Sequence, residues 1–477
     1  MPPVTLGPHP VGPADPACPP AARTKIAVIG AGIAGLGAAW LLSQRHDVTL
    51  FEREARLGGH SHTVDVPGID GPIAVDTGFI VYNERNYPNL TALFDHLGVA
   101  TQASDMSFAV SIAGGDLEYA GSRVGALFAQ KRNLLRPRMW RMLRDVLRFY
   151  REAPALLDKA DYAHVTLRDY LEEAGYSEDF LYDHLLPMGA EIWSCSLDDI
   201  GAHPVQSFVR FFDNHGLLQL GARPQWRTVT GGSREYVRRL RDRLSATVAT
   251  GRAARHVRRT AGGVTVTDAL GKTALFDRVL IATHADEALG LLEDPSAAER
   301  EVLGAFRYIA NDVVLHGDKS LMPRRRAAWS SWNYLCDDRR PISPRVCATY
   351  WMNRLQSLDP RVPLFITLNP IRAPRDDLVY RRFQYDHPQF DTAALAAQKR
   401  LAGLQGVAAT WFAGSYAGHG FHEDALASGL AAAEALARDI GPVTRPWARP
   451  GARDTSVGPD ISPNVVAGMP ARKVAAA

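Results

Sequence analysis

Cysteine is scarce in this sequence, and so are long apolar runs. The 477 residues include four cysteines, Cys18, Cys195, Cys336 and Cys347, and no two of them form a C-x-x-C pair. So few thiols in so long a chain do not make a disulfide framework, and we expect a reducing cytoplasm. No run approaches the roughly 20 apolar residues of a membrane-spanning helix, and the proline-rich residues 1–23 lack the apolar core of a signal peptide.

An excess of one charge is also absent. Lysine and arginine total 54 against 51 aspartate and glutamate residues, which leaves a net charge of +3. This near balance does not predict a nucleic-acid partner. With 46% hydrophobic and 22% charged residues, the composition is that of a globular protein, and the chain is long enough for two domains.

The strongest pattern in the sequence is a glycine-rich turn within residues 25–52. An apolar run leads into Gly30, Gly32 and Gly35. An alanine-rich helical pattern follows, and a second apolar run ends on Glu52, 22 positions after Gly30. Glycines at this spacing allow a tight turn and close approach to a pyrophosphate, the helix N-terminus attracts phosphates, and the acid can bind ribose hydroxyls. The sequence therefore predicts a dinucleotide site.

Similar strand and helix patterns recur in two later segments, so the chain divides into two interleaved domains. We expect an α/β fold in which a Rossmann-like domain is interrupted twice by a mixed α+β domain that binds substrate. Both ends of the chain lack periodicity and are expected to be irregular. The predicted division is a cofactor domain at 24–90, 225–290 and 405–440, a substrate domain at 91–224 (mainly helical) and 291–404, a leader at 1–23 and a tail at 441–477.

Five motifs in order resemble flavoproteins of the amine oxidase, phytoene desaturase and protoporphyrinogen oxidase superfamily. The resemblance covers most of residues 25–440 and implies FAD as the cofactor, bound by a domain like that of glutathione reductase. Because the last motif contains no cysteine, we expect the flavin to be held without a covalent bond. The motifs occupy residues 30–39 with Glu52, 57–60, 75–80, 277–284 and 412–432.

The glycine pattern and the resemblance together assign the cofactor-binding residues, although three positions depart from the superfamily's pattern. His60 stands where an arginine is usual, and Ser415 stands where an acid is usual. Residues 308–316 lack the lysine of the amine oxidases' active-site strand, which counts against a simple amine oxidase. The predicted FAD-binding residues are Gly30, Gly32, Ile33, Ala34, Gly35, Glu52, Arg53, Gly58, Gly59, His60, Gly78, Phe79, Ile80, Val257, Gly414, His422 and Ala425.

Further sequence segments, among them residues 77–90 and 224–237, resemble one bacterial subgroup of the superfamily. Its members are associated with cyclopropane-synthase-type methyltransferases that modify unsaturated acyl chains. The resemblance implies an FAD-dependent oxidoreductase that desaturates or dehydrogenates an unsaturated or methyl-branched fatty acyl chain of a membrane lipid, with a lipid methyltransferase as a partner. Three alternatives stay open: a flavin amine oxidase acting on a small amine, an isomerase that uses reduced flavin, and a non-catalytic flavoprotein partner of the methyltransferase.

Three residues are candidates for catalysis because their motif positions would place them beside the cofactor. If hydride leaves an allylic carbon, a neighbouring proton must leave too, and a nearby base would help. His284, Tyr350 and His419 are the candidates, and each also has a purely structural reading. His419 and His422 are three positions apart rather than the four typical of a helical metal site, so no metal is expected.

Residues 128–154 form an unusually basic segment. They carry eight basic residues, Lys131 and seven arginines, against two acidic residues. Such a helix can lie on an anionic bilayer, or it can pack its apolar side into the core. The first reading predicts a cytoplasmic protein in peripheral contact with the inner membrane face. The apolar residues at helical spacing are Leu135, Met139, Met142, Leu143, Val146, Leu147 and Tyr150.

Overall fold

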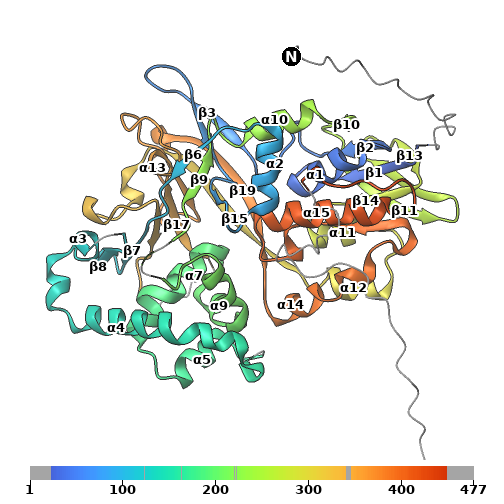
Figure 1. The fold of residues 1–477 in the computed structure, drawn as a ribbon. Coiled ribbons are helices and arrows are strands. Elements are labelled where there is room, and N and C mark those ends of the chain that lie inside the picture. The colour runs from blue at the N-terminus through green and yellow to red at the C-terminus, as the bar shows by residue number, and fades with distance from the viewer. Residues whose placement is uncertain are drawn as a thin grey trace, which may run out of the picture.

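The computed structural model describes residues 23–122, 124–162, 164–219, 221, 223–339 and 345–447. Cys18, almost all of the predicted leader and the tail beyond Trp447 lie outside the described residues. Two large sheets form the centres of two domains, which lie side by side in Figure 1. None of the helices in the described ranges is both long and apolar enough to cross a membrane.

A five-stranded parallel sheet forms the centre of the first domain. Three segments that are far apart in the sequence contribute strands to it, and β1 lies in the middle between β2 and β14. These strands are apolar and mostly buried, as expected when other layers cover both faces of a parallel sheet. The strand order is β10 (Thr247–Ala249), β2 (Asp47–Phe51), β1 (Lys25–Ile29), β14 (Arg278–Ile281) and β20 (Thr410–Phe412).

Helices cover one face of this sheet, and a small antiparallel sheet with short helices covers the other. Helix α1 (Ile33–Leu42) is buried at all ten positions and packs directly on α15 (His422–Ala437). With them lie α2 (Pro88–Leu97) and α10 (Arg234–Asp242). The opposite layer contains β11 (Ala254–Thr260), β12 (Gly263–Asp268), β13 (Thr273–Phe276), α11 (Ala285–Leu291), α12 (Ala297–Leu303) and α14 (Thr392–Gln398).

A seven-stranded mixed sheet forms the centre of the second domain. Both predicted insertions contribute to it, because β7 from the first insertion pairs in parallel with β16 from the second. The stretch 91–224 therefore begins with strands before it becomes helical. The order is β19 (Val379–Gln389), β15 (Arg307–His316), β18 (Phe365–Leu368), β17 (Cys347–Trp351), β16 (Trp332–Leu335), β7 (Phe108–Ile112) and β8 (Leu117–Ala120).

A layer of helices packs on the β7, β8 and β16 side of this sheet. Its core joins Phe180, Phe208 and Phe212 from the helices to Tyr119 and Tyr334 from the sheet. This layer lies at the lower left of Figure 1, away from the parallel sheet. Its helices are α3 (Val124–Leu127), α4 (Pro137–Glu152), α5 (Leu167–Glu173), α6 (Glu178–Phe180), α7 (Leu186–Trp193), α8 (Leu197–Gly201) and α9 (Val205–Asn214).

Helix α4 explains the amphipathic pattern of residues 128–154. Met139, Met142 and Val146 are buried in the helical layer, so most of the predicted apolar stripe is core rather than surface. Leu143 and Tyr150 are partly buried, whereas Leu135 and Leu147 are exposed. The arginines of the segment pair with carboxylates, among them Arg138 with Asp183 and Arg141 with Asp179. The stripe itself is therefore not free to lie on a bilayer.

Short elements connect the two domains around the buried carboxylate of Asp76. The elements are the hairpin β3 (Thr63–Val66) and β4 (Ile73–Asp76), the sheet β5 (Tyr82–Asn83), β9 (Trp226–Val229) and β6 (Thr101–Ser104), and helix α13 (Met352–Leu355). Asp76 accepts hydrogen bonds from Thr63, from the backbone and hydroxyl of Ser233, and from Gln356 Nε2 at 3.0 Å. One side chain thus joins four segments of the chain.

Replacing this carboxylate is expected to destabilise the protein. In Asp76→Ala several buried donors lose their acceptor, and we expect the free energy of unfolding to fall by about 3 kcal/mol. Asp65→Ala, on the same hairpin, removes an exposed ion pair with Arg234 and should cost less than about 1 kcal/mol. Urea unfolding of both variants, saturated with cofactor, measures the difference, and equal losses would contradict this role for Asp76.

Candidate functional site

The glycine turn lies where β1 ends and α1 begins, at the carboxyl edge of the parallel sheet, where ligands of such sheets bind. Gly30 has φ +96°, and a Cβ there would lie 2.7 Å from the carbonyl oxygen of Ala282. No atom lies within 4 Å of the position that a Cβ on Gly32 would take, and no side chain caps α1. The first N–H groups of α1 therefore face open space, as a phosphate-binding helix requires.

Glu52 is held against this turn. Its carboxylate accepts hydrogen bonds from the backbone N–H groups of Ala31 at 2.8 Å and Glu54 at 2.9 Å. Its side chain is buried at the end of β2, so it is oriented before any ribose arrives. Arg53 points elsewhere and forms an exposed ion pair with Glu287 at 2.6 Å. Val257 lies in the apolar cluster that contains Phe51, at the end of β2.

Two further loops pack on the glycine turn. Gly58 donates a hydrogen bond from its N–H to the carbonyl oxygen of Ala31 at 2.8 Å, and Phe79 donates to that of His60 at 2.8 Å. A Cβ on Gly59 would lie 3.0 Å from the Cα of Gly32, and one on Gly78 would lie 2.3 Å from the His60 carbonyl oxygen. The loops that were predicted to approach the cofactor thus lie in direct contact with each other. Ile80, next to Gly78, packs against the apolar cluster of β3, β4 and the large sheet.

The C-terminal segment returns to the same edge of the sheet. Gly414 follows β20 and donates a hydrogen bond from its N–H to Ser428 Oγ at 3.0 Å. A Cβ on Gly414 would lie 3.2 Å from the carbonyl oxygen of Thr283, beyond β14. Helix α15 begins eight residues later, and Ala425 packs against the cluster that contains α1. The predicted residues of the first, second and last motifs are therefore brought together in space, although 384 positions separate Gly30 from Gly414.

His422, the first residue of α15, is a buried, uncharged ring. It stacks on Phe79 with ring centroids 3.9 Å apart, and its Nε2 lies 2.8 Å from the hydroxyl of Tyr236. Tyr236 also hydrogen bonds with Ser61. Burial lowers the pKa of His422 to about 3, so the ring is neutral at physiological pH. It supports the loop of Phe79 rather than carrying charge.

Three more rings gather around His60 where the two domains meet. The centroid of His60 lies 5.0 Å from that of Tyr385, 5.8 Å from that of His387 and 6.4 Å from that of His284. Burial lowers the pKa of His60 well below its ordinary value and that of His387 to about 4. His60 Nε2 is buried with no hydrogen-bond partner among the residues the structure describes. This group, the histidine cluster, therefore offers neutral imidazoles with a spare polar atom.

Strand β15 contains residues 308–316, which lack the lysine of the amine oxidases' active-site strand, and it passes beside this cluster. Asn311 on β15 donates from its amide to the carbonyl oxygen of Ile309 at 3.0 Å, and the same nitrogen lies 3.5 Å from His387 Nδ1. Its side-chain oxygen accepts a hydrogen bond from Asn369 at 2.8 Å. Within the described ranges, no three His, Cys, Asp or Glu side chains are arranged to hold a metal ion.

The three candidate catalytic residues lie at different points of the site. His284 belongs to the histidine cluster and stacks on Tyr308, with centroids 4.4 Å apart. Tyr350 is buried on β17 and meets Trp332 edge to face at 5.1 Å. His419 contacts Phe211 of the helical layer at 5.9 Å, and burial lowers its pKa to about 4. They do not form a single catalytic group.

Sequence reasoning missed several residues of the site. Tyr385 and His387 belong to no motif in the sequence. The sequence indicates only that these two residues, two positions apart, would share one face of a strand. Glu191 was also missed, although it is the single charged residue in the otherwise apolar helix α7. Glu191 is 1% exposed, and neither carboxylate oxygen has a partner in the described part of the chain.

Glu191 lies where α7 rests on the large sheet. Its charge would act on Tyr350 and Tyr334 of that sheet. Burial raises the pKa of Glu191 well above its usual range, which favours the un-ionised carboxylic acid. An un-ionised carboxyl group can donate one hydrogen bond and accept others without placing a charge among apolar side chains.

The space at the glycine turn fits FAD. An uncapped helix N-terminus faces the position of a pyrophosphate, an oriented acid lies beside it for a ribose, and glycine loops leave room for close backbone approach. His60 adds a buried polar atom that still lacks a partner in the described structure. Together these features match the chemistry of a nucleotide attached to a planar ring system.

Comparison with known proteins agrees with this fit. The model of a family described as flavin containing amine oxidoreductase matches residues 33–314, more than half of the chain. Among solved structures, a protein from Exiguobacterium sp. 255-15 assigned as a protoporphyrinogen oxidase is similar with a TM-score of 0.63 and 16% identity, covering 87% of this chain and 99% of that one. The predictions of an α/β flavoprotein fold and of FAD are confirmed, whereas the domain boundaries and individual contact residues stay predictions.

Two further structures have the same fold. A fatty acid isomerase from P. acnes that produces CLA has a TM-score of 0.62 and 16% identity, covering 87% of this chain and 98% of that one. Cyclohexylamine oxidase from Brevibacterium oxydans IH-35A has a TM-score of 0.61 and 17% identity, covering 88% and 99%. At such identities the likeness extends to the fold, and the reaction must be argued from the residues of this chain.

A substitution at Gly32 separates cofactor binding from folding. A methyl group there meets no protein atom, so Gly32→Ala should fold with unchanged thermal stability without FAD, yet bind FAD at least tenfold more weakly because the methyl enters the phosphate space. Gly290→Ala, on the exposed side of α11 with equally open surroundings, is the matched control. Flavin absorbance during titration measures both, and unchanged FAD affinity in Gly32→Ala would place the phosphates elsewhere.

The proton on Glu191 should be visible in the pH dependence of stability. Because its pKa is raised in the folded state, burial of the ionised form costs free energy, and that cost grows as pH rises above the unfolded pKa of about 4.5. Glu191→Gln removes the cost, so its free energy of unfolding relative to wild type should increase by up to about 1.4 kcal/mol per pH unit. Urea unfolding from pH 5 to 8 measures this difference.

The exposed Glu172→Gln is the control for that series. Its stability relative to wild type should stay level over the same pH range. A level difference for Glu191→Gln as well would mean that the folded protein holds Glu191 ionised.

Proposed function

Because this chain belongs to the flavin-containing amine oxidoreductase family, we propose that its substrate is a fatty acyl chain of a membrane lipid, unsaturated or methyl-branched, which it desaturates or dehydrogenates. The chain is a flavin-dependent oxidoreductase, and the proposal concerns the substrate and the bond that is oxidised. The observation that carries it is the apolar character of the sheet face that continues from the histidine cluster.

The strand register defines that face. Every second residue of β15, counted from Asn311, has its side chain on the same side of the sheet as Asn311. The residues paired with them on neighbouring strands lie on that side too. None of these residues on β15 from Ile309 to Leu315, or on β18, β17 and β16, is charged, whereas the partner of Leu315 on β19 is Arg381. Glu191 approaches this face from α7, and burial raises its pKa. The residues are Ile309, Val313 and Leu315 on β15, Ile366 and Leu368 on β18, Ala348 and Tyr350 on β17, and Trp332 and Tyr334 on β16.

This lining favours an acyl chain over an amine. An ammonium group would need an ionised carboxylate or an aromatic cage to offset its desolvation. An acyl chain gains free energy from burial against aliphatic and aromatic side chains, at roughly 25 cal/mol per Å². The similar fold of a fatty acid isomerase is compatible with this choice, although cyclohexylamine oxidase shares the fold equally well.

The chain's own residues then have distinct tasks. When bound, FAD supplies the acceptor for the hydride that leaves the substrate carbon. The apolar face orients the acyl chain and excludes water from it. The imidazoles of His60, His284 and His387 are the groups placed to take the proton that leaves the neighbouring carbon. Asn311 holds the His387 side of the cluster in place.

Two partners complete the proposal. We propose that the protein meets its substrate at an anionic membrane, and that a lipid methyltransferase supplies the modified acyl chain. Cyclopropane-synthase-type enzymes act on the same class of unsaturated acyl chains, which is what supports the pairing.

The experiment is an anaerobic incubation of holoprotein with phospholipids that carry unsaturated or methyl-branched chains. We expect the flavin absorbance to bleach and mass spectrometry to show loss of two hydrogen atoms from the acyl chain, with oxygen or a quinone restoring the absorbance. Saturated straight-chain phospholipids are the control. Failure of every lipid to bleach the flavin would reject the proposal.

The alternatives give different results in the same assay. Peroxide formed from a panel of small amines would indicate an amine oxidase. Movement of a double bond without consumption of an acceptor would indicate an isomerase. Copurification with a lipid methyltransferase, without turnover of any lipid or amine, would indicate a non-catalytic partner.

A further inference from the structure

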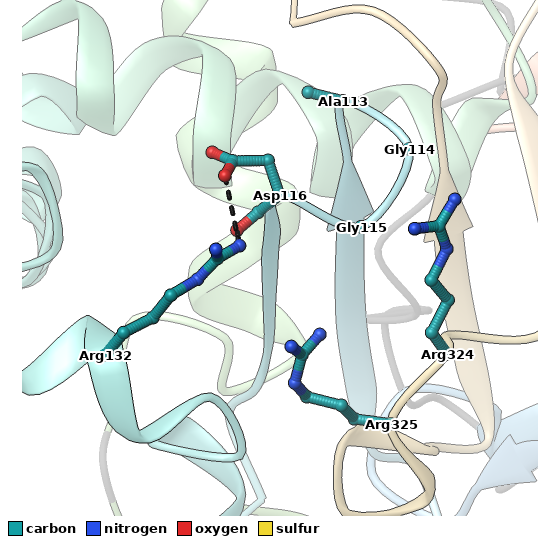
Figure 2. A pocket seen from close by; sticks show the side chains of 7 residues that line it. All are labelled: Ala113, Gly114, Gly115, Asp116, Arg132, Arg324 and Arg325. Atoms are coloured by element: carbon teal, nitrogen blue, oxygen red, sulfur yellow. Dashed lines mark hydrogen bonds and ion pairs between the residues drawn. The ribbon is translucent and has the colours of Figure 1, made fainter.

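A surface hollow of about 580 Å³ lies at the turn between β7 and β8. Figure 2 shows its lining, in which the side chains of Arg132, Arg324 and Arg325 approach the turn from different sides. The turn itself is formed by Ala113, Gly114, Gly115 and Asp116. None of these residues belongs to the cofactor site or to the apolar face described above.

The hollow carries a surplus of positive charge. Asp116 is the one carboxylate in its lining, and three arginines share it: Arg132 at 3.0 Å, Arg136 at 2.9 Å and Arg138 at 3.9 Å. Arg325 pairs with the buried Glu118 at 2.9 Å. Glu118 also accepts hydrogen bonds from the backbone N–H groups of residues 324 and 325, so its lone pairs are fully used.

Among the residues that the structure describes, Arg324 is the arginine of this group without an acceptor. Its guanidinium has no hydrogen-bond or ion-pair acceptor within the described ranges, and its side chain is exposed. It lies across the turn, since a Cβ on Gly115 would come within 3.0 Å of Arg324 Cδ. Gly115 therefore makes room for Arg324, which no carboxylate in the described part of the chain neutralises.

Exposed apolar side chains stand beside the arginines. Arg132 belongs to the 3-10 helix η1 (Lys131–Leu135), whose last two residues, Leu134 and Leu135, are 48% and 88% exposed. Trp140 is 52% exposed and donates a hydrogen bond from its ring N–H to the carbonyl oxygen of Leu134 at 2.9 Å. Val124, on α3, is 75% exposed. Leucine and tryptophan next to unneutralised arginine are the combination that binds the interface of an anionic bilayer.

This region is remote from the cofactor. β8 and β19 are the two outer strands of the seven-stranded sheet, and six strand spacings of roughly 4.8 Å separate them by about 29 Å. Figure 1 likewise places α3 and β8 at the end of the molecule opposite the parallel sheet. A ligand in the hollow therefore holds the protein in place and does not take part in the redox step.

We propose that this hollow binds the phosphate group of an anionic phospholipid, with Arg324, Arg132 and Arg325 as its ligands. Leu134, Leu135 and Trp140 enter the interfacial layer of the same bilayer. The inference rests on the proposed function, because a membrane-bound acyl substrate is what gives the contact a purpose. It differs from the predicted use of α4, whose apolar stripe is buried, because the contact is made by η1, the β7–β8 turn and Trp140 near the start of α4.

The experiment is cosedimentation of holoprotein with vesicles of phosphatidylcholine alone or mixed with phosphatidylglycerol. We expect binding to the mixed vesicles only, weakening as salt is raised. Arg324→Glu reverses the unneutralised charge and should weaken binding about tenfold or more. Leu135→Ser should also weaken it, because the anchor loses its most exposed apolar side chain.

Arg45→Glu is the matched control, since Arg45 is an exposed arginine next to α1 in the other domain. It should bind the mixed vesicles as wild type does. Wild-type binding to neither vesicle, equal binding to both, or full binding by Arg324→Glu would overturn the proposal. Inorganic phosphate at matched ionic strength distinguishes a free-anion site, because displacement from vesicles by phosphate beyond that caused by chloride would overturn the bilayer assignment.

Turnover of a lipid dispersed in detergent separates this proposal from the proposed function. Arg324→Glu should retain wild-type turnover there, because the reaction does not use the hollow. Vesicle binding without any lipid turnover would reject the proposed substrate and leave the membrane contact standing.

Discussion

The close packing of α15 on α1 is the contact on which the rest of the structure depends. A Cβ on Gly429 would lie 2.2 Å from the carbonyl oxygen of Ala34, and one on Gly37 would lie 2.7 Å from Leu426 Cδ1, so only glycine allows the helices to approach this far. This contact brings the last part of the chain back to the glycine turn of the first part. Without it, His422 would not meet Phe79 and Ser61, and the cofactor site would lack one wall.

The second domain depends on a different constraint, the register of the seven-stranded sheet. Because side chains alternate between faces, pairing of Asn311 with Tyr385 and of Ile309 with His387 sets the polar cluster and the apolar lining on one face. A shift of one residue would turn these apolar side chains away from the core that they form with the β3–β4 hairpin. The hydroxyl groups of Tyr385 and Thr77 also form a hydrogen bond, with the two oxygens 2.8 Å apart. This bond fixes the sheet to the loop of the predicted flavin motif.

Buried ionisable groups are unusually common around the site, and burial decides their charge. His60, His387 and His422 are neutral because desolvation lowers the pKa of each imidazole, and desolvation raises the pKa of the Glu191 carboxyl, which favours its uncharged form. The arginines at the β7–β8 turn lie at the surface, at the other end of the seven-stranded sheet. The molecule thus separates an uncharged reaction region from a charged region at the opposite end.

The sequence by itself determined the cofactor turn, because strand, glycine turn, helix and acid lie within residues 25–52 and their chemistry is local. The α/β class and FAD followed from it and from motifs in a fixed order. Only the tertiary structure decided that His387 and Tyr385 meet His60, that Glu191 is buried without a partner, and that α4 turns its apolar stripe into the core. These facts depend on contacts between segments far apart in the chain, and an amphipathic pattern has the same form whether its partner is a protein core or a membrane.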